Sequence, residues 1–172
     1  NLHTLLRACA QLWRSGEERP LVVVGARREA VASMTEPDLR QRVICTGYVA
    51  EADLPAVYCG ADLFAFPSLY EGFGLPVLEA MACGVAVVCS NAASLPEVAG
   101  NAAITTDPLD VNGLAEAMRS VLADPDLRQQ MGAQGLERAQ QFTWARTAAE
   151  TWSMYREILA AETEQSVYTE LG

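Results

Sequence analysis

Residues 67–84 decide the fold, and they read Pro-Ser-Leu-Tyr-Glu-Gly-Phe-Gly-Leu-Pro-Val-Leu-Glu-Ala-Met-Ala-Cys-Gly. An apolar, strand-like run at 63–66 leads into a glycine turn at 72–74, after which the sequence predicts a helix. Pro76 suits the first helical position, where its missing N–H would have no intrahelical partner, and Gly84 is placed to end the helix. A strand, a glycine turn and a helix N-terminus together aim free backbone N–H groups at an anion.

Two carboxylates, Glu71 and Glu79, bracket this turn. A carboxylate does not bind phosphate directly, but it accepts hydrogen bonds from hydroxyl groups such as those of a ribose or a hexose. A phosphate flanked by two polyol groups describes a nucleotide sugar. The alternative is a solvated turn residue at 71 and a surface charge at 79, although an almost wholly apolar helix makes a freely solvated Glu79 unfavourable.

The rest of the chain alternates short apolar runs with helical patterns. The continuous apolar run at 21–25 is typical of a parallel strand covered on both faces, and further strands are expected at 43–46, 63–66, 85–89 and 102–105. This order predicts an α/β fold, with a Rossmann-like, mostly parallel sheet and helices on both faces. Helices or helical turns are expected at about 2–14, 26–34, 53–59, 76–83, 94–97, 114–122, 125–141 and 144–161.

Ligands of such sheets bind beyond the carboxyl ends of the strands. The glycine-rich and polar candidates all fall at those ends, at 25, 47–48, 68–74 and 90–94. A dinucleotide-dependent dehydrogenase is excluded, because the five residues from Gly25 lack the G-x-G-x-x-G pattern after their strand.

Composition limits the partners. The formal charge is −10, and all 12 basic residues are Arg. No basic face is visible, so a nucleic-acid partner is not expected. No apolar run reaches the roughly 18 residues of a membrane span, and the lone His3 cannot build a metal site. The five cysteines show no C-x-x-C spacing and predict buried free thiols in a reducing, cytoplasmic compartment; they are Cys9, Cys45, Cys59, Cys83 and Cys89.

The string at 67–84 resembles, nearly letter for letter, the C-terminal half of retaining glycosyltransferases with the GT-B fold, of the family 4 or group 1 type. The similarity continues through 90–100 and on to Phe142-Thr-Trp144. The resemblance implies a donor-binding domain over 1–161 and a frayed tail at 162–172. It also implies that the acceptor-binding N-terminal half and the first central strand of this sheet are absent, so that 21–25 and 63–66 flank a gap and the fragment alone is inactive.

The resemblance also implies roles for individual residues. Glu71 would be the catalytic residue, orienting the donor sugar or acting electrostatically, and Glu79 would accept hydrogen bonds from the ribose. No metal and no cofactor are expected, because N–H donors can stabilise the charge that develops on the leaving diphosphate. The remaining donor-binding candidates are the amides of Gly72, Phe73, Gly74 and Leu75, with Gly25, Tyr48 and Val49 near the nucleotide and Ser94 near the phosphates.

Several alternatives stay open at this stage. Tyr48 is as well explained by packing at a strand end as by a base contact. Trp144 is expected in the core rather than in contact with a ligand. Relatives place an Arg and a Lys on the diphosphate, just before the position that corresponds to Asn1. This chain has no Lys, and Arg27 or Arg28 is the substitute that the sequence offers.

The donor implied is an NDP-sugar, either GDP-mannose or a UDP-sugar, used to transfer a hexose in polysaccharide, glycolipid or cell-envelope glycan synthesis. Membrane contact, at the inner face, would come only through the absent half. The alternative function is a non-catalytic module that binds a nucleotide or sugar, or docks another chain.

Overall fold

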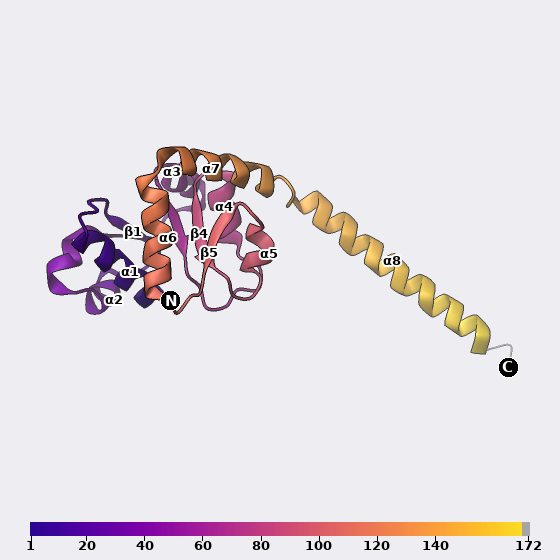
Figure 1. Cartoon of the computed structure of the whole chain (residues 1–172). Coiled ribbons are helices and arrows are strands. Elements are labelled where there is room, and N and C mark those ends of the chain that lie inside the picture. The colour runs from indigo at the N-terminus through magenta and orange to yellow at the C-terminus, as the bar shows by residue number, and fades with distance from the viewer. Residues whose placement is uncertain (170–172) are drawn as a thin grey trace. The chain divides into compact units, whose positions relative to one another are not determined.

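The computed structural model describes the backbone of residues 1–169 and the side chains of residues 1–160. The chain divides into two compact units, Asn1–Ala139 and Gln140–Gly172 (Figure 1). The boundary falls inside the single domain that the sequence predicted over 1–161.

The first unit alternates strands with helices, which confirms the predicted α/β class. Most elements begin and end within a few residues of their predicted bounds, because glycines, prolines and caps mark their ends. In chain order the elements are α1 (Leu2–Arg14), β1 (Leu21–Val24), α2 (Arg28–Met34), the 3-10 helix η1 (Pro37–Arg42), β2 (Val43–Gly47), the 3-10 helix η2 (Glu51–Asp53), α3 (Leu54–Cys59), β3 (Phe64–Phe66), α4 (Leu75–Ala82), β4 (Val87–Ser90), α5 (Leu95–Ala99), β5 (Ala103–Thr106), α6 (Val111–Ala123) and α7 (Pro125–Ala139).

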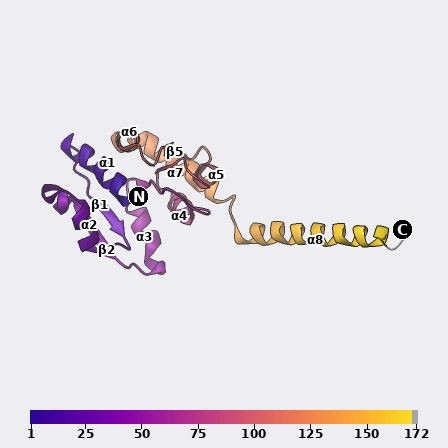
Figure 2. The same cartoon turned by 90° about the horizontal axis from the view of Figure 1, so that it is seen from below.

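The strands form two parallel sheets. In one, β1 pairs with β2, and in the other β4 lies between β3 and β5. Figure 2 shows β1 and β2 beside α1 and α2. In the part of the chain that the structure describes, β1 and β3 each have one strand neighbour and are therefore edge strands. Strands β2 and β5 are edge strands in the same sense, so the gap between β1 and β3 stays a prediction.

Strand β4 is covered on both faces, as its continuous apolar run predicts. Val87 and Cys89 belong to a core shared with α4 and α5. Val88, together with Ala86 just before the strand, belongs to a core shared with α1 and α6. Alternate residues of one strand thus serve two helical layers. The prediction of a buried parallel strand is confirmed here.

For strand β1, the prediction of a strand covered on both faces is wrong. Val22 and Val24 are 45% and 42% exposed, and Ile44 of β2 is 49% exposed. The other face of this sheet contributes Leu21 and Val43 to the core around α1 and α6. Helix α3, which follows β2 in the chain, buries none of its residues. With one covered face and one unpaired edge, β1 is apolar on a side that the described residues leave open.

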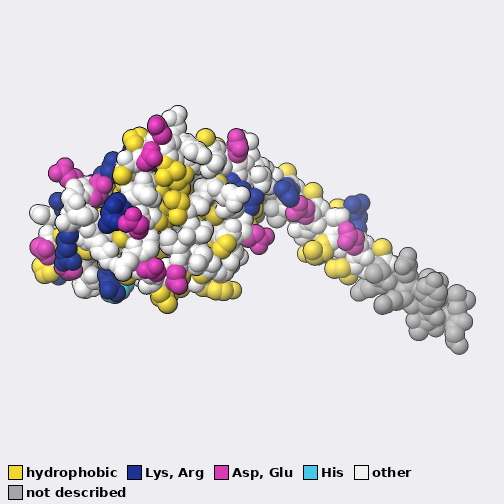
Figure 3. Space-filling model, in the orientation of Figure 1, with side chains coloured by type: hydrophobic (Ala, Val, Ile, Leu, Met, Phe, Trp, Pro, Cys, Tyr) yellow, Lys and Arg dark blue, Asp and Glu magenta, His cyan; other side chains and the backbone are white. Residues whose placement is uncertain are grey.

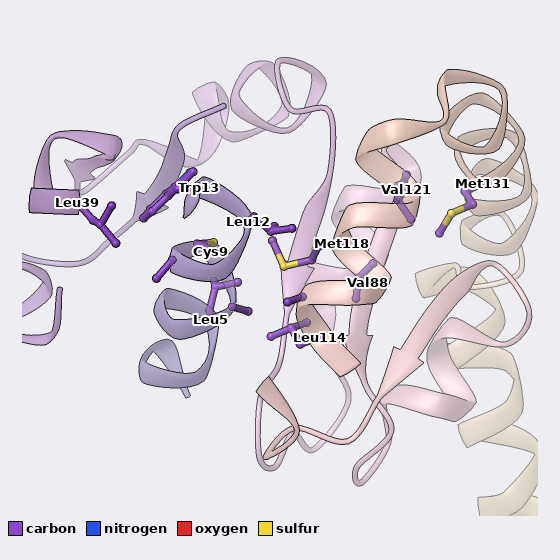
Figure 4. Packing of buried hydrophobic residues seen from close by; sticks show 14 residues of the cluster. Leu5, Cys9, Leu12, Trp13, Leu39, Val88, Leu114, Met118, Val121 and Met131 are labelled. Atoms are coloured by element: carbon purple, nitrogen blue, oxygen red, sulfur yellow. The ribbon is translucent and has the colours of Figure 1, made fainter. Parts of the chain in front are cut away.

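Helix α1 positions the start of the site. It packs against α6, where Leu12 and Met118 point toward each other (Figure 4). At its N-terminus, the Asn1 Nδ2 donates hydrogen bonds to the carbonyl oxygens of Pro67, at 2.9 Å, and Pro108, at 2.6 Å. The segment that follows β3 is thereby tied to α1 and to the loop before α6.

The cysteine prediction is correct in part. Cys9 and Cys89 are buried free thiols, and burial raises the pKa of Cys9 to about 12 and that of Cys89 to about 11. Cys45 and Cys83 are only half-buried, and Cys59 is exposed, so the prediction is wrong for these three. The reason is local: Cys45 lies on the half-covered sheet, and Cys59 ends α3, which buries none of its residues.

The second unit holds one long helix, α8 (Trp144–Thr169), which runs past the end predicted at about 161. No Gly or Pro interrupts this segment, so no residue in it strongly opposes helix formation. Trp144 is 82% exposed, so its expected place in the core is wrong. Hydrophobic side chains are visible along α8 in Figure 3. The end of the predicted frayed tail, 170–172, lies outside the described residues.

None of the helices among the described residues, α8 included, combines the length and the apolar character needed to cross a lipid bilayer.

Candidate functional site

The turn between β3 and α4 depends on one glycine. Gly74 caps the helix with φ +105°, in the left-handed region that side chains disfavour. A Cβ atom at this position would lie 2.5 Å from Cδ2 of Leu95, which is fully buried. Glycine therefore allows both the conformation and the close packing. Helix α4 begins at Leu75, so Pro76 is its second residue rather than its first.

The turn leaves backbone donors unused. Within the described structure, no group accepts a hydrogen bond from the N–H of Gly72, Gly74 or Leu75, and the cap supplies no side-chain bond. The Gly74 carbonyl, by contrast, accepts from the Val77 N–H at 3.0 Å. The first turn of a helix carries partial positive charge. The N–H groups of these three residues are thus available among the described residues, and they suit an acceptor such as a phosphate oxygen.

Glu71 is held just before this turn. The Ser68 hydroxyl donates to Glu71 Oε1 at 2.8 Å. The Ser94 hydroxyl lies 2.9 Å from the Glu71 carbonyl oxygen and 2.8 Å from that of Phe73. Ser94 was predicted to lie near phosphates, and the contacts it makes in the structure are to the carbonyls of the turn. It joins the start of α5 to the loop that carries Glu71.

Ser90, at the end of β4, hydrogen-bonds to the same loop. Its side chain is fully buried, and its hydroxyl donates to the Ser68 carbonyl at 2.6 Å and accepts from the Ala92 N–H at 3.3 Å. Sequence reasoning placed 68 and 90 at the ligand edge but did not predict this bond. A serine directly after a buried apolar strand was the available signal, because a buried hydroxyl requires a partner.

Glu79 faces α3. Tyr58 donates its hydroxyl hydrogen to Glu79 Oε2 at 2.9 Å. Burial, and then the neighbouring Glu79 carboxylate, raises the pKa of Tyr58 above its ordinary value. The phenol therefore stays protonated and remains a donor at neutral pH. Tyr58 was not predicted as a site residue, since nothing in the local sequence connects it to a residue 21 positions later.

The remaining candidates lie at the ends of the other sheet. Gly25, with φ +80°, donates its N–H to the Gly47 carbonyl at 2.8 Å, which joins the carboxyl ends of β1 and β2. Tyr48 is 89% exposed, so packing at the strand end is wrong and a contact with a ligand stays open. Val49 is half-buried. The described hydrogen bonds do not join Gly25, Tyr48 or Val49 to the turn at 72–75.

No cluster of three or more His, Cys, Asp or Glu suited to a metal ion occurs among the described side chains. The geometry is thus a set of helix-terminal N–H donors between two carboxylates.

Comparison with known proteins then decides the family. The profile described as "Glycosyl transferases group 1" matches residues 1–138. The chain belongs to this family.

Individual relatives agree with the assignment. The chain is 41% identical to O-antigen chain mannosyltransferase B of Escherichia coli over 161 residues. The aligned region covers 91% of this chain and 42% of that relative. Among solved structures, sucrose-phosphate synthase from Thermosynechococcus elongatus is similar with a TM-score of 0.79 and 32% identity, over 92% of this chain and 42% of that chain.

A second solved structure is HepE of Anabaena in complex with UDP, with a TM-score of 0.74 and 25% identity, over 88% of this chain and 44% of that chain. The chain spans less than half the length of each of these three proteins. The fold is accordingly that of one half of a GT-B glycosyltransferase.

Proposed function

We propose that the first unit is the nucleotide-sugar-binding domain of a retaining, family 4 type glycosyltransferase and that it binds its donor at the turn before α4. The observation that supports this most directly is the pattern of polar groups around the turn. Three N–H groups without an acceptor in the described structure lie between two carboxylates, Glu71 and Glu79. The N–H groups suit a diphosphate, and the carboxylates suit the hydroxyls on either side of it.

In each carboxylate, one oxygen accepts a hydrogen bond from a hydroxyl group and the other oxygen is available to a ligand. Ser68 donates to Oε1 of Glu71, and Tyr58 donates to Oε2 of Glu79. Among the described residues, no donor meets the second oxygen of either group. In the proposed complex, Glu71 orients the sugar and stabilises its positive charge as the glycosidic bond to the diphosphate breaks. Glu79 accepts from the ribose, and the N–H donors stabilise the leaving group without a metal.

The donor we propose is a GDP- or UDP-linked hexose. Mannose is favoured because the Escherichia coli relative is named a mannosyltransferase, whereas the Anabaena structure holds UDP. The acceptor would bind elsewhere in a longer protein, in a half that this chain does not include. We place the reaction in polysaccharide, glycolipid or cell-envelope glycan synthesis, in the cytoplasm or at the inner face of the membrane.

One observation favours a second function, that of a non-catalytic binding module. A diphosphate is usually met by Arg or Lys as well as by N–H groups, and this chain contains no Lys. Arg27 and Arg28, the substitutes that the sequence offers, lie at the start of α2. A module that binds a nucleotide weakly, without transferring sugar, would not need further Arg or Lys side chains on the diphosphate.

Titration of the 172-residue chain with GDP, UDP and ADP, followed by NMR or calorimetry, tests the site. At least one nucleotide should bind, and Glu79→Gln should weaken it roughly tenfold or more, since a hydrogen bond to a charged group contributes about 1.5–3 kcal/mol. Glu137→Gln is the matched control, because Glu137 is an exposed carboxylate of α7. Absence of binding by all three nucleotides, or equal behaviour of the two variants, would refute the proposed site.

A further inference from the structure

Two thiols that are far apart in the sequence meet at the ends of α3 and α4. Cys59 is the last residue of α3, and Cys83 caps the end of α4. The Cys59 thiol donates toward the Cys83 carbonyl oxygen, with 4.0 Å between Sγ and O. Each cysteine is followed by a glycine, Gly60 or Gly84.

The helices that carry the two thiols are held together next to them. The 2.9 Å bond between Tyr58 and Glu79 joins α3 to α4 one residue before Cys59 and one helical turn before Cys83. The Cys83 N–H donates to the Glu79 carbonyl at 3.1 Å. Helix α4 is in turn fixed by its buried residues, which are Val77, Ala80 and Met81. The separation of the two thiols is therefore set by the fold and not by chance contact of mobile side chains.

The pair differs from the other thiols in its access to solvent. Cys59 is exposed and Cys83 is half-buried, whereas Cys9 and Cys89 are buried. Partial burial, followed by the nearby Cys59 and Glu79, raises the pKa of Cys83. Cys83 is accordingly held as a neutral thiol, and Cys59 is the thiol that a reagent in solution meets first.

We propose that Cys59 and Cys83 form a reversible dithiol–disulfide site whose reaction partner is a small-molecule disulfide such as oxidised glutathione. The Cys59 thiolate attacks one sulfur of the reagent, so that a mixed disulfide forms and one thiolate leaves. Cys83 then loses its proton to solvent and attacks Cys59 Sγ, which releases the second thiolate. Two protein thiols are oxidised to one disulfide, the reagent is reduced to two thiols, and the protons released reappear on them.

Closing the disulfide would move the Cys59 Sγ from the Cys83 carbonyl oxygen to the Sγ of the same residue. A disulfide needs the two sulfurs to approach to about 2.05 Å, with the Cβ atoms about 3.5–4.5 Å apart. Both cysteines lie at helix C-termini next to glycines, where side chains and backbone adjust more easily than inside a helix. The site lies one helical turn from Glu79, but its chemistry does not depend on the proposed nucleotide site and is tested without any nucleotide.

The test is to incubate the reduced chain, still folded, with oxidised glutathione, to block the remaining thiols by alkylation, and to map the peptides by mass spectrometry. The expected product is a monomer with Cys59 linked to Cys83 and two hydrogen atoms lost. The variant C83S should instead retain glutathione on Cys59, and C59S should form no internal link. The matched control C45S, which removes another half-buried thiol, should leave the link unchanged.

A second measurement does not depend on oxidation. Phenylarsine oxide condenses with two neighbouring thiols, with loss of one water, and the reduced chain should bind one equivalent that either C59S or C83S abolishes. The proposal is overturned if wild-type Cys59 retains glutathione without forming the link, if the link joins other cysteines, or if the serine variants still bind the arsenical as tightly. Serine is close to cysteine in size, so both variants should keep the wild-type melting temperature, which is measured alongside.

Discussion

Replacement of Gly74 by alanine tests whether this single residue holds the turn. The residue has φ +105° and ψ +44°, a conformation that costs an L-residue roughly 1–2 kcal/mol. The added Cβ would also lie 2.5 Å from Cδ2 of the buried Leu95, and overpacking of this kind costs roughly 1–3 kcal/mol. Together the two costs predict a loss of about 2–5 kcal/mol, against a total stability of about 5–15 kcal/mol for a typical domain.

Urea denaturation followed by circular dichroism measures this loss. With a slope of about 2 kcal/mol per molar urea, the midpoint of Gly74→Ala should fall by roughly 1–2.5 M. Gly72→Ala is the control two residues earlier: its φ is not positive, and a Cβ there would meet no atom within 4 Å. Its stability should stay the same or rise by about 0.4–1 kcal/mol, because alanine restricts the unfolded chain.

A double-mutant cycle separates the two costs. In a Leu95→Ala background the steric contact is gone, so Gly74→Ala should cost only the conformational part, roughly 1–2 kcal/mol. Equal midpoints for Gly74→Ala and Gly72→Ala would refute the reasoning altogether. An unchanged cost of Gly74→Ala in the Leu95→Ala background would refute its steric part.

Three further changes test the elements around the site. Gly132→Ala should lower the melting temperature through a loss of roughly 1–3 kcal/mol, because its Cβ would lie 2.3 Å from the Gly84 carbonyl oxygen, where α7 meets α4. Asp110→Ala should cost about 0.5–2 kcal/mol in urea, since its carboxylate accepts from two N–H groups in the first turn of α6. The unfolded chain ionises Cys9 and Cys89 near their ordinary pKa of 9.0, while the folded chain keeps them protonated to about 12 and 11. Stability from these thiols is therefore complete below about pH 9 and is lost as the pH rises from there toward the folded-state pKa values of about 11 and 12. Urea midpoints should accordingly fall between about pH 9 and 11, and they should fall less after conservative replacement of both cysteines.

Local patterns account for what could be predicted from the sequence. The helix α4 and the strand β4 follow from a glycine turn, an early proline and a continuous apolar run, each of which acts within a few residues. The cap of α6 is local as well, because the Asp110 side chain accepts hydrogen bonds from N–H groups two and three residues later. The amide donors at 72–75 belong to this class, because a turn and the helix after it are specified by the same short segment.

The contacts that complete the site are not local. Ser90 reaches the Ser68 carbonyl across 22 residues, and Tyr58 reaches Glu79 across 21. The pairing of Cys59 with Cys83 depends on how α3 lies against α4, which no spacing in the chain encodes. The open face of β1 was missed for a related reason, since an apolar run shows what a strand can bury and not whether a partner covers it.

The polar groups of the turn are satisfied unevenly, and this asymmetry indicates what the turn can bind. The carbonyls of Ser68, Glu71 and Phe73 meet hydroxyls from β4 and the start of α5, and that of Gly74 meets a helical N–H. The neighbouring N–H groups of 72, 74 and 75 meet no acceptor among the described residues. With four of its carbonyls engaged and three of its N–H groups unengaged, the turn directs the positive ends of those three peptide dipoles toward a ligand. Water could satisfy those donors, but an anion with several oxygens satisfies them together, and for this reason the serines matter as much to the proposed site as the glycines do.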